Sequence, residues 1–137
     1  MLANMTVKEL ITKHEGIRLK PYLDTVGKLT IGIGRNLTDV GITTIEAEML
    51  LDTDLRNATA AAQDIFPMFW GYSDGRKKAL VDMLFNLGKA RFLGFQKFIA
   101  AVKAEDWITA EVEMLDSLWA TQVPSRAQED AALILAG

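Results

Sequence analysis

Two carboxylates near the start of the chain stand in contrasting surroundings. Glu15 falls at the end of a predicted helix, and Asp24 falls just before a predicted turn around Gly27. A carboxylate in the last turn of a helix faces the negative end of the helix macrodipole, which favours its protonated form. Two carboxyl groups in different environments across a groove are the arrangement that glycoside hydrolysis uses. The pair therefore suggests acid-base chemistry on a sugar.

The segment from about Tyr22 to Ile33 predicts a β-hairpin that carries Asp24. A three-residue turn at Val26–Lys28 would place Asp24 opposite Thr30, with both side chains on one face. The other face would hold four apolar side chains that could join a core: Leu23, Leu29, Ile31 and Ile33. The first face would hold Tyr22, Asp24, Thr30, Gly32 and Gly34. Glycine inside a strand often marks a close approach of a ligand, so this face could be the floor of a groove.

Simpler explanations exist for the same residues. An Asp before a turn often accepts hydrogen bonds from the amides of that turn, and glycines near a hairpin can permit twist or a bulge. Glu15 could be a surface glutamate paired with Arg18 or Lys20.

The rest of the chain has the apolar spacing of helices. Two segments match the capping-box pattern at the start of a helix: Thr6 to Glu9 and Thr43 to Glu46. Three residues are expected to end helices: Gly16, Pro67 and Gly88. The predicted helices span 6–16, 43–65, 73–88, 94–104, 106–119 and about 124–137. Trp107, Ala110, Met114 and Leu118 should point inward. This order predicts an α+β, mostly helical fold with one domain over residues 1–137.

The composition excludes several classes of protein. There are no cysteines, which rules out a disulfide framework and a thiol nucleophile. The net charge of −3 without a basic stripe argues against nucleic-acid binding. No signal peptide and no run of eighteen apolar residues is present, so we expect no membrane insertion. His14 is the only histidine, and we expect neither a metal nor another cofactor.

Together, these residues resemble a known family. Glu15-Gly16, Tyr22, Asp24-Thr25, Gly27 and the stretch Thr30 to Gly34 resemble the phage-type lysozymes, with the spacing Glu-x8-Asp-x5-Thr. The resemblance continues through Gly41-Ile42-Thr43, Glu46-Ala47-Glu48, Phe85-Asn86-Leu87-Gly88 and a W-x-x-Q-x-P-x-R-A motif at Trp119, Gln122, Pro124, Arg126 and Ala127. It implies a lysozyme-like fold with a small hairpin lobe (about 15–42), a helical lobe from the rest, and a cleft between them.

The resemblance also implies roles for individual residues. Glu15 would be the general acid, Asp24 would stabilise the oxocarbenium charge and help position water, and Thr30 would orient that water. Tyr22, Gly32, Phe85 and Asn86 would line the sugar subsites. Gln122, Pro124 and Arg126 would brace the hairpin, with Arg126 near Glu15. Arg35 stands where a histidine is common in the family, and we expect it to pair with Asp54.

The implied activity is that of an inverting peptidoglycan muramidase, an endolysin that acts in host cell lysis. It would be a monomer that waits in the host cytoplasm for a membrane lesion. Two alternatives remain open. A lytic transglycosylase would need only Glu15, and a non-catalytic wall-binding or scaffold module could keep the fold without the chemistry. The acidic charge and the short carboxyl end favour the second alternative, whereas Asp24 and Thr30 argue against both.

Overall fold

The computed structural model describes all 137 residues and divides them into two compact units, residues Met1–Met49 (unit 1) and Leu50–Gly137 (unit 2). The boundary falls inside helix α2 (Thr44–Ile65). Helices dominate, and the only sheet is small and antiparallel, so the predicted α+β, mostly helical class is confirmed. A single domain with a cleft between two lobes stays a prediction.

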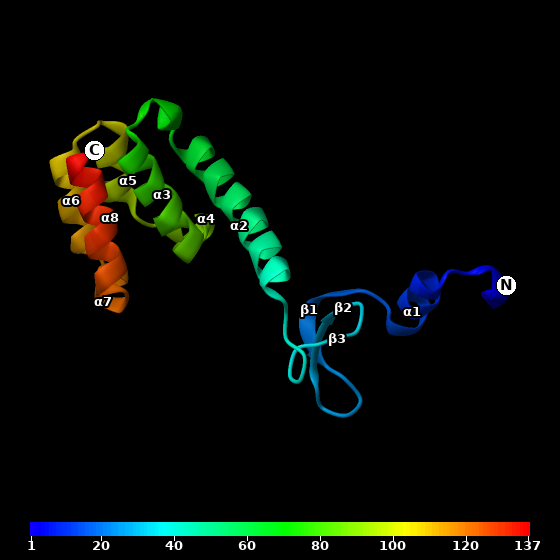
Figure 1. Ribbon diagram of the computed structural model, residues 1–137. Helices are drawn as coiled ribbons and strands as arrows, with labels where there is room; N and C mark the ends of the chain where they lie inside the picture. Colours follow the sequence, from blue (N-terminus) through cyan, green and yellow to red (C-terminus); the bar gives the residue numbers. More distant parts are fainter. The chain divides into compact units, whose positions relative to one another are not determined.

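Unit 1 contains one complete α-helix followed by a three-stranded sheet. Its elements are the short 3-10 helix η1 (Leu2–Asn4), α1 (Val7–Glu15), β1 (Arg18–Leu23), β2 (Leu29–Gly32) and β3 (Arg35–Asn36), and then the start of α2 (Figure 1). The predicted capping box of α1 is present between Thr6 and Glu9, and Gly16 ends the helix with a φ of 69°. The strands run in the order β1-β2-β3. The third strand was not predicted.

The hairpin has a different register from the predicted one. Leu23 pairs with Leu29 and Tyr22 pairs with Thr30, so Asp24 does not oppose Thr30. Asp24 instead begins a longer loop, because its Oδ1 accepts the amides of Val26 (2.9 Å) and Lys28 (2.8 Å). An Asp that binds nearby backbone amides stabilises such a turn directly. The register also shifts between Arg18 and Tyr22, where β1 carries an irregularity.

The burial of the sheet also differs from expectation. Thr30, predicted to lie on an open face, is 4% exposed. The predicted core side chains Leu23, Leu29 and Ile33 are exposed by 69%, 41% and 40%. Unit 1 therefore has no apolar core of its own beneath this sheet, and its hairpin is held by the backbone and turn hydrogen bonds.

Unit 2 is a helical bundle. After α2 come the 3-10 helix η2 (Phe69–Gly71), α3 (Asp74–Leu87), α4 (Lys89–Phe92), α5 (Gln96–Lys103), α6 (Trp107–Leu115), α7 (Leu118–Gln122) and α8 (Pro124–Ala136). Helix α8 packs against α3, α6 and α7, and α5 packs against α6 (Figure 1). The predicted ends of α2 at Ile65, of α3 at Gly88 and the start of α8 at Pro124 are confirmed.

One predicted helix is broken. The expected helix over 106–119 ends at Leu115, and α7 begins at Leu118, because the Ser117 side chain accepts the amide of Ala120 and caps a new helix. As a result Leu118 is 72% exposed, contrary to its predicted inward position, whereas Ala110 and Met114 are fully buried as predicted. The short helix α4 was also not predicted.

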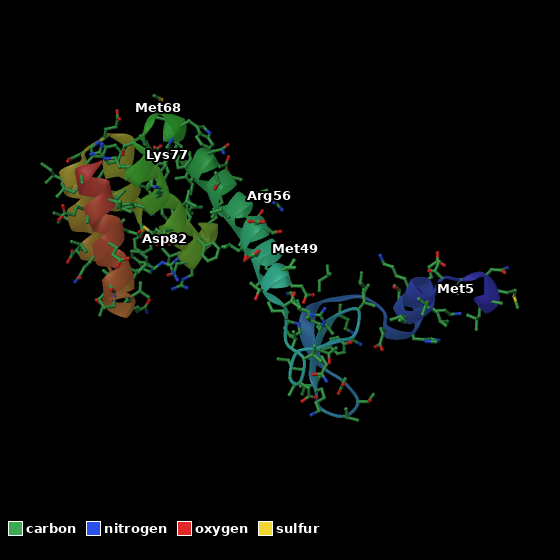
Figure 2. All side chains as sticks on the ribbon, viewed as in Figure 1. Met5, Met49, Arg56, Met68, Lys77 and Asp82 are labelled. Carbon is green, nitrogen blue, oxygen red and sulfur yellow. The ribbon has the colours of Figure 1, made fainter.

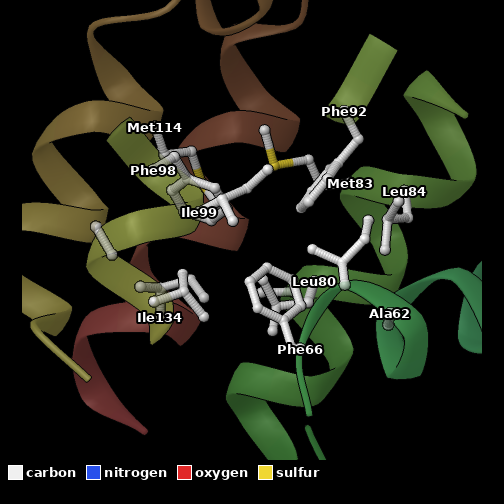
Figure 3. Close-up of a cluster of buried hydrophobic side chains, with 14 of the residues drawn as sticks. Ala62, Phe66, Leu80, Met83, Leu84, Phe92, Phe98, Ile99, Met114 and Ile134 are labelled. Carbon is white, nitrogen blue, oxygen red and sulfur yellow. The ribbon is translucent and has the colours of Figure 1, made fainter. Parts of the chain in front are cut away.

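A continuous apolar core fills unit 2. Its largest fully buried side chains include Phe66, Leu80, Met83, Phe92, Phe98, Met114 and Ile134 (Figure 3). The Phe92 ring makes edge contacts with Phe66 and Phe98 at centroid distances of 6.0 and 6.1 Å, a geometry that aromatic rings favour. Across the whole chain, no helix has both the length and the apolar content needed to cross a membrane.

Candidate functional site

Glu15 is the last residue of α1, and its side chain is exposed. It makes no hydrogen bond or ion pair in the structure, so the alternative of pairing with Arg18 or Lys20 is not observed. The Arg18 guanidinium instead lies 4.3 Å from the centre of the Tyr22 ring. The Glu15 side chain lies against Gly34, in the turn between β2 and β3. An acid without a protein partner is free to interact with a ligand.

Asp24 and Thr30 are connected through the backbone of a single residue, Lys28. Asp24 Oδ1 accepts the Lys28 amide, and the Lys28 carbonyl accepts both the Asp24 amide (2.9 Å) and the Thr30 hydroxyl (2.9 Å). Asp24 is half-buried and its Oδ2 has no donor from the protein. The loop thus fixes both side chains and leaves one carboxylate oxygen available.

The other residues predicted for the open face of the hairpin have different surroundings. Tyr22 is half-buried and faces Thr30 across the β1–β2 pair. Gly32 pairs with Arg18, and a side chain added at Gly32 would meet nothing within 4 Å, as a ligand-facing position requires. Gly34 differs, because the Glu15 side chain already fills the space above it. The expectation that both glycines leave room for a ligand is therefore wrong for Gly34.

Arg35 pairs with Glu46 and not with the predicted Asp54. Its Nη1 lies 2.7 Å from Glu46 Oε1 and 3.2 Å from the Gly41 carbonyl. The hydrogen bond from Arg35 and the amide of Thr43 lower the pKa of Glu46 to about 2. Glu46 lies in the first turn of α2, in the predicted capping box with Thr43 (2.9 and 3.1 Å), whereas Asp54 comes two turns later, roughly 12 Å along the helix axis.

Phe85 and Asn86, the predicted sugar-binding residues of unit 2, lie in the last turn of helix α3. Phe85 is 40% exposed. Asn86 accepts a hydrogen bond from the indole N–H of Trp119 at 2.7 Å, and Trp119 is 3% exposed, as expected for a core residue. This contact orients the Asn86 amide so that its NH₂ group remains available. Gln122, the last residue of α7, is exposed.

Arg126 forms a two-pronged ion pair with Asp82, which the sequence did not predict. Its Nε and Nη2 donate to the two Asp82 oxygens at 2.8 and 2.7 Å, joining α8 to α3. Figure 2 labels Asp82 on α3. The expected proximity of Arg126 to Glu15 stays a prediction, because the two residues belong to different units.

A buried acid completes this cluster. Asp130 is 3% exposed, and its Oδ2 has no hydrogen-bond partner. Burial and the neighbouring Asp82 carboxylate raise the pKa of Asp130 to about 8, whereas Arg126 lowers the pKa of Asp82. These opposite shifts favour a protonated Asp130 beside an ionised Asp82.

The cluster lines a groove of about 750 Å³ on unit 2, together with Phe85 and several apolar side chains. Asp130 could have been noticed in the sequence, because it interrupts an apolar stripe of α8 that buries Ala127, Ala131 and Ile134. No three histidine, cysteine or acidic side chains come together in a way that could hold a metal ion.

Similarity to known proteins extends over most of the chain. The profile of the phage lysozyme family matches residues 12–129. The pre-baseplate central spike protein Gp5 of Enterobacteria phage T4 is 30% identical over 98% of this chain and 28% of its own length. Two probable T4-type lysozymes of Dictyostelium discoideum are each 26% identical, over 96% and 89% of this chain and 95% and 89% of their own lengths. The chain thus spans little more than a quarter of Gp5 but nearly all of the Dictyostelium proteins.

Proposed function

The chain belongs to the phage lysozyme family, and from that premise we propose that it is a peptidoglycan muramidase. It would hydrolyse the β-1,4 bond between N-acetylmuramic acid and N-acetylglucosamine with inversion at the anomeric carbon. The observation that carries the proposal is the connection of Asp24 and Thr30 through Lys28, in the same unit as a Glu15 carboxyl without a protein partner.

The hydrogen bonds of Asp24 and Thr30 suit them to hold a water molecule. The Thr30 hydroxyl donates its hydrogen to the Lys28 carbonyl. Its oxygen can therefore only accept a hydrogen bond from a water molecule. Asp24 Oδ1 is occupied by two amides, which leaves Oδ2 to accept the second water proton. A water that donates both protons in this way turns a lone pair toward the anomeric carbon.

Glu15 would complete the reaction from the other side of the glycosidic bond. It would protonate the leaving oxygen, while the Asp24 carboxylate stabilises the oxocarbenium-like charge. An inverting enzyme needs room for water, so its carboxyl groups lie about 6.5–9.5 Å apart. Tyr22, Gly32, Phe85 and Asn86 would contact the sugars, and Gln122 and Arg126 would support the site.

A role in host lysis is a further part of the proposal. A chain with this activity would act as an endolysin, with antimicrobial action on walls that it can reach. The transglycosylase and binding-module alternatives are distinguished by their products. A transglycosylase leaves a 1,6-anhydro sugar, a muramidase leaves a reducing end with one added water, and a binding module releases nothing.

The test compares wild type with Glu15→Gln, which removes the ionisable proton and keeps the shape of the side chain. Glu48→Gln, at an exposed position in the same unit, is the matched control. Purified peptidoglycan and permeabilised Gram-negative cells are the substrates, and released fragments are identified by mass spectrometry. We expect reducing-end products from wild type and Glu48→Gln, and a loss of turnover of at least 100-fold in Glu15→Gln.

Three results would contradict the proposal. Anhydro products would indicate a transglycosylase. Binding without release by the folded wild type would indicate a binding module. Near-normal turnover by Glu15→Gln would show that another group supplies the proton.

A further inference from the structure

We propose that Gly34 is a positioning residue for the Glu15 carboxyl, because the space left by its missing side chain is where Glu15 lies. The inference deepens the proposed function, since it concerns the acid of that reaction. It gives the glycine at position 34 a role beyond the turn that its φ of 71° already favours.

The contact is closer than any side chain at position 34 would allow. A Cβ atom at Gly34 would lie 2.7 Å from Glu15 Cδ, 2.8 Å from Oε2 and 3.0 Å from Cγ. Carbon atoms in contact normally lie about 3.5–4.0 Å apart. An alanine at position 34 would therefore displace the Glu15 carboxyl by roughly 1 Å, or push the end of α1 away from the sheet.

Other glycines of unit 1 have a positive φ close to that of Gly34 but lack this contact. Gly16, Gly27, Gly32 and Gly41 have φ between 69° and 81°, close to the 71° of Gly34. A Cβ atom at any of these four would meet nothing within 4 Å. No protein side chain occupies the space beside these four glycines, whereas the Glu15 side chain fills the space beside Gly34.

The consequence for catalysis follows from geometry. A general acid must lie within hydrogen-bond reach of the oxygen that it protonates, and a 1 Å misplacement can cost about 100-fold in rate. Substrate binding depends on other side chains. We therefore expect Gly34→Ala to lower kcat by about 100-fold while KM changes little.

Gly41→Ala is the matched control. It adds a Cβ atom at a similar positive φ of 69°, in open space and outside the proposed sugar-binding residues. Both alanine variants are also made in a Glu15→Ala background, which removes the side chain that would collide. Thermal unfolding of unit 1, followed by the amide NMR resonances of β2, gives a result that does not depend on activity.

The expected result is a coupling between positions 34 and 15. Gly34→Ala should lower Tm more than Gly41→Ala, and this excess should disappear in the Glu15→Ala background. The kcat of Gly41→Ala should stay near the wild-type value. No excess, an excess that persists without Glu15, or equal kcat in both variants would overturn the inference. A folded wild type without turnover would refute the proposed function instead, and the coupling would still decide whether Gly34 positions Glu15.

Discussion

Replacing Asp130 by Asn should remove a pH dependence from the stability of unit 2. Burial between α3 and α8, with the Asp82 carboxylate beside it, raises the pKa of Asp130 from the ordinary 3.8 to about 8. Of the other charged groups that act on it, Arg126 lowers this pKa and Glu129 raises it. The unfolded chain loses these neighbours, so its Asp130 titrates near the ordinary value.

The sign follows from the protons bound in each state. Between pH 4 and 8 the folded unit holds a proton on Asp130 that the unfolded chain has released, so stability falls as the pH rises. The slope is about 1.4 kcal/mol per pH unit, or at most about 3 kcal/mol between pH 5 and 7. It flattens above about pH 8. Asp82 stays ionised in both states from pH 5 to 8, because its ordinary pKa of 3.8 lies below this range and Arg126 lowers the pKa further in the folded state.

The chain suits this measurement because its fluorescent tryptophans and its only histidine, a residue type that titrates in this pH range, belong to different units. All three tryptophans, Trp70, Trp107 and Trp119, belong to unit 2, so their fluorescence in urea follows that unit. The single histidine, His14, belongs to unit 1. Free energies of unfolding are measured from pH 5 to 8 for wild type, Asp130→Asn and the exposed control Asp116→Asn. We expect the free energy of unfolding to fall with pH in wild type and in Asp116→Asn, and to lose this pH dependence in Asp130→Asn.

Two results would refute this reasoning. A wild-type stability that is flat from pH 5 to 7 would mean that Asp130 holds no extra proton when folded. An unchanged slope in Asp130→Asn would mean that a different group takes up the proton.

Two further predictions concern single side chains. Thr30→Glu should place a carboxylate beneath the anomeric carbon and trap the sugar covalently, which mass spectrometry of the incubated variant would detect; unchanged inverting turnover without an adduct would contradict the proposed water position. Arg126→Lys should lower unit 2 stability by about 1 kcal/mol, because an ammonium cannot reproduce the two parallel bonds to Asp82. A urea midpoint equal to that of wild type would show that the pair contributes nothing to folding.

The sequence predicted elements whose signals are local. The capping boxes at Thr6 and Thr43, the cap at Ser73 and the stop at Gly88 act within one turn of a helix, so the sequence around them contains the whole interaction. The hairpin register failed for a related reason. The pattern of alternation does not show how Asp24 will use its side chain, and two amide hydrogen bonds lengthen the loop.

Contacts between distant residues were not predictable from local patterns. Several acidic residues of α2 were candidate partners for Arg35. Only the folded structure shows that the partner is Glu46. The pairing of Arg126 with Asp82 links residues 44 positions apart. Asp130 did leave a trace, because a charged residue on an apolar stripe must find a partner or keep its proton.

The placement of the proposed catalytic groups depends on the backbone more than on neighbouring side chains. Gly16 ends the helix directly after Glu15, the Lys28 peptide fixes Asp24 and Thr30, and Gly34 makes room for Glu15. All three groups therefore belong to a unit of 49 residues that buries no apolar side chain. Substitutions that alter its turns should change the rate of the proposed reaction before they change its binding, since the turns set the geometry of the reacting groups. Unit 2, with its packed core and the Arg126–Asp82–Asp130 cluster, should instead set how the chain responds to heat, urea and pH.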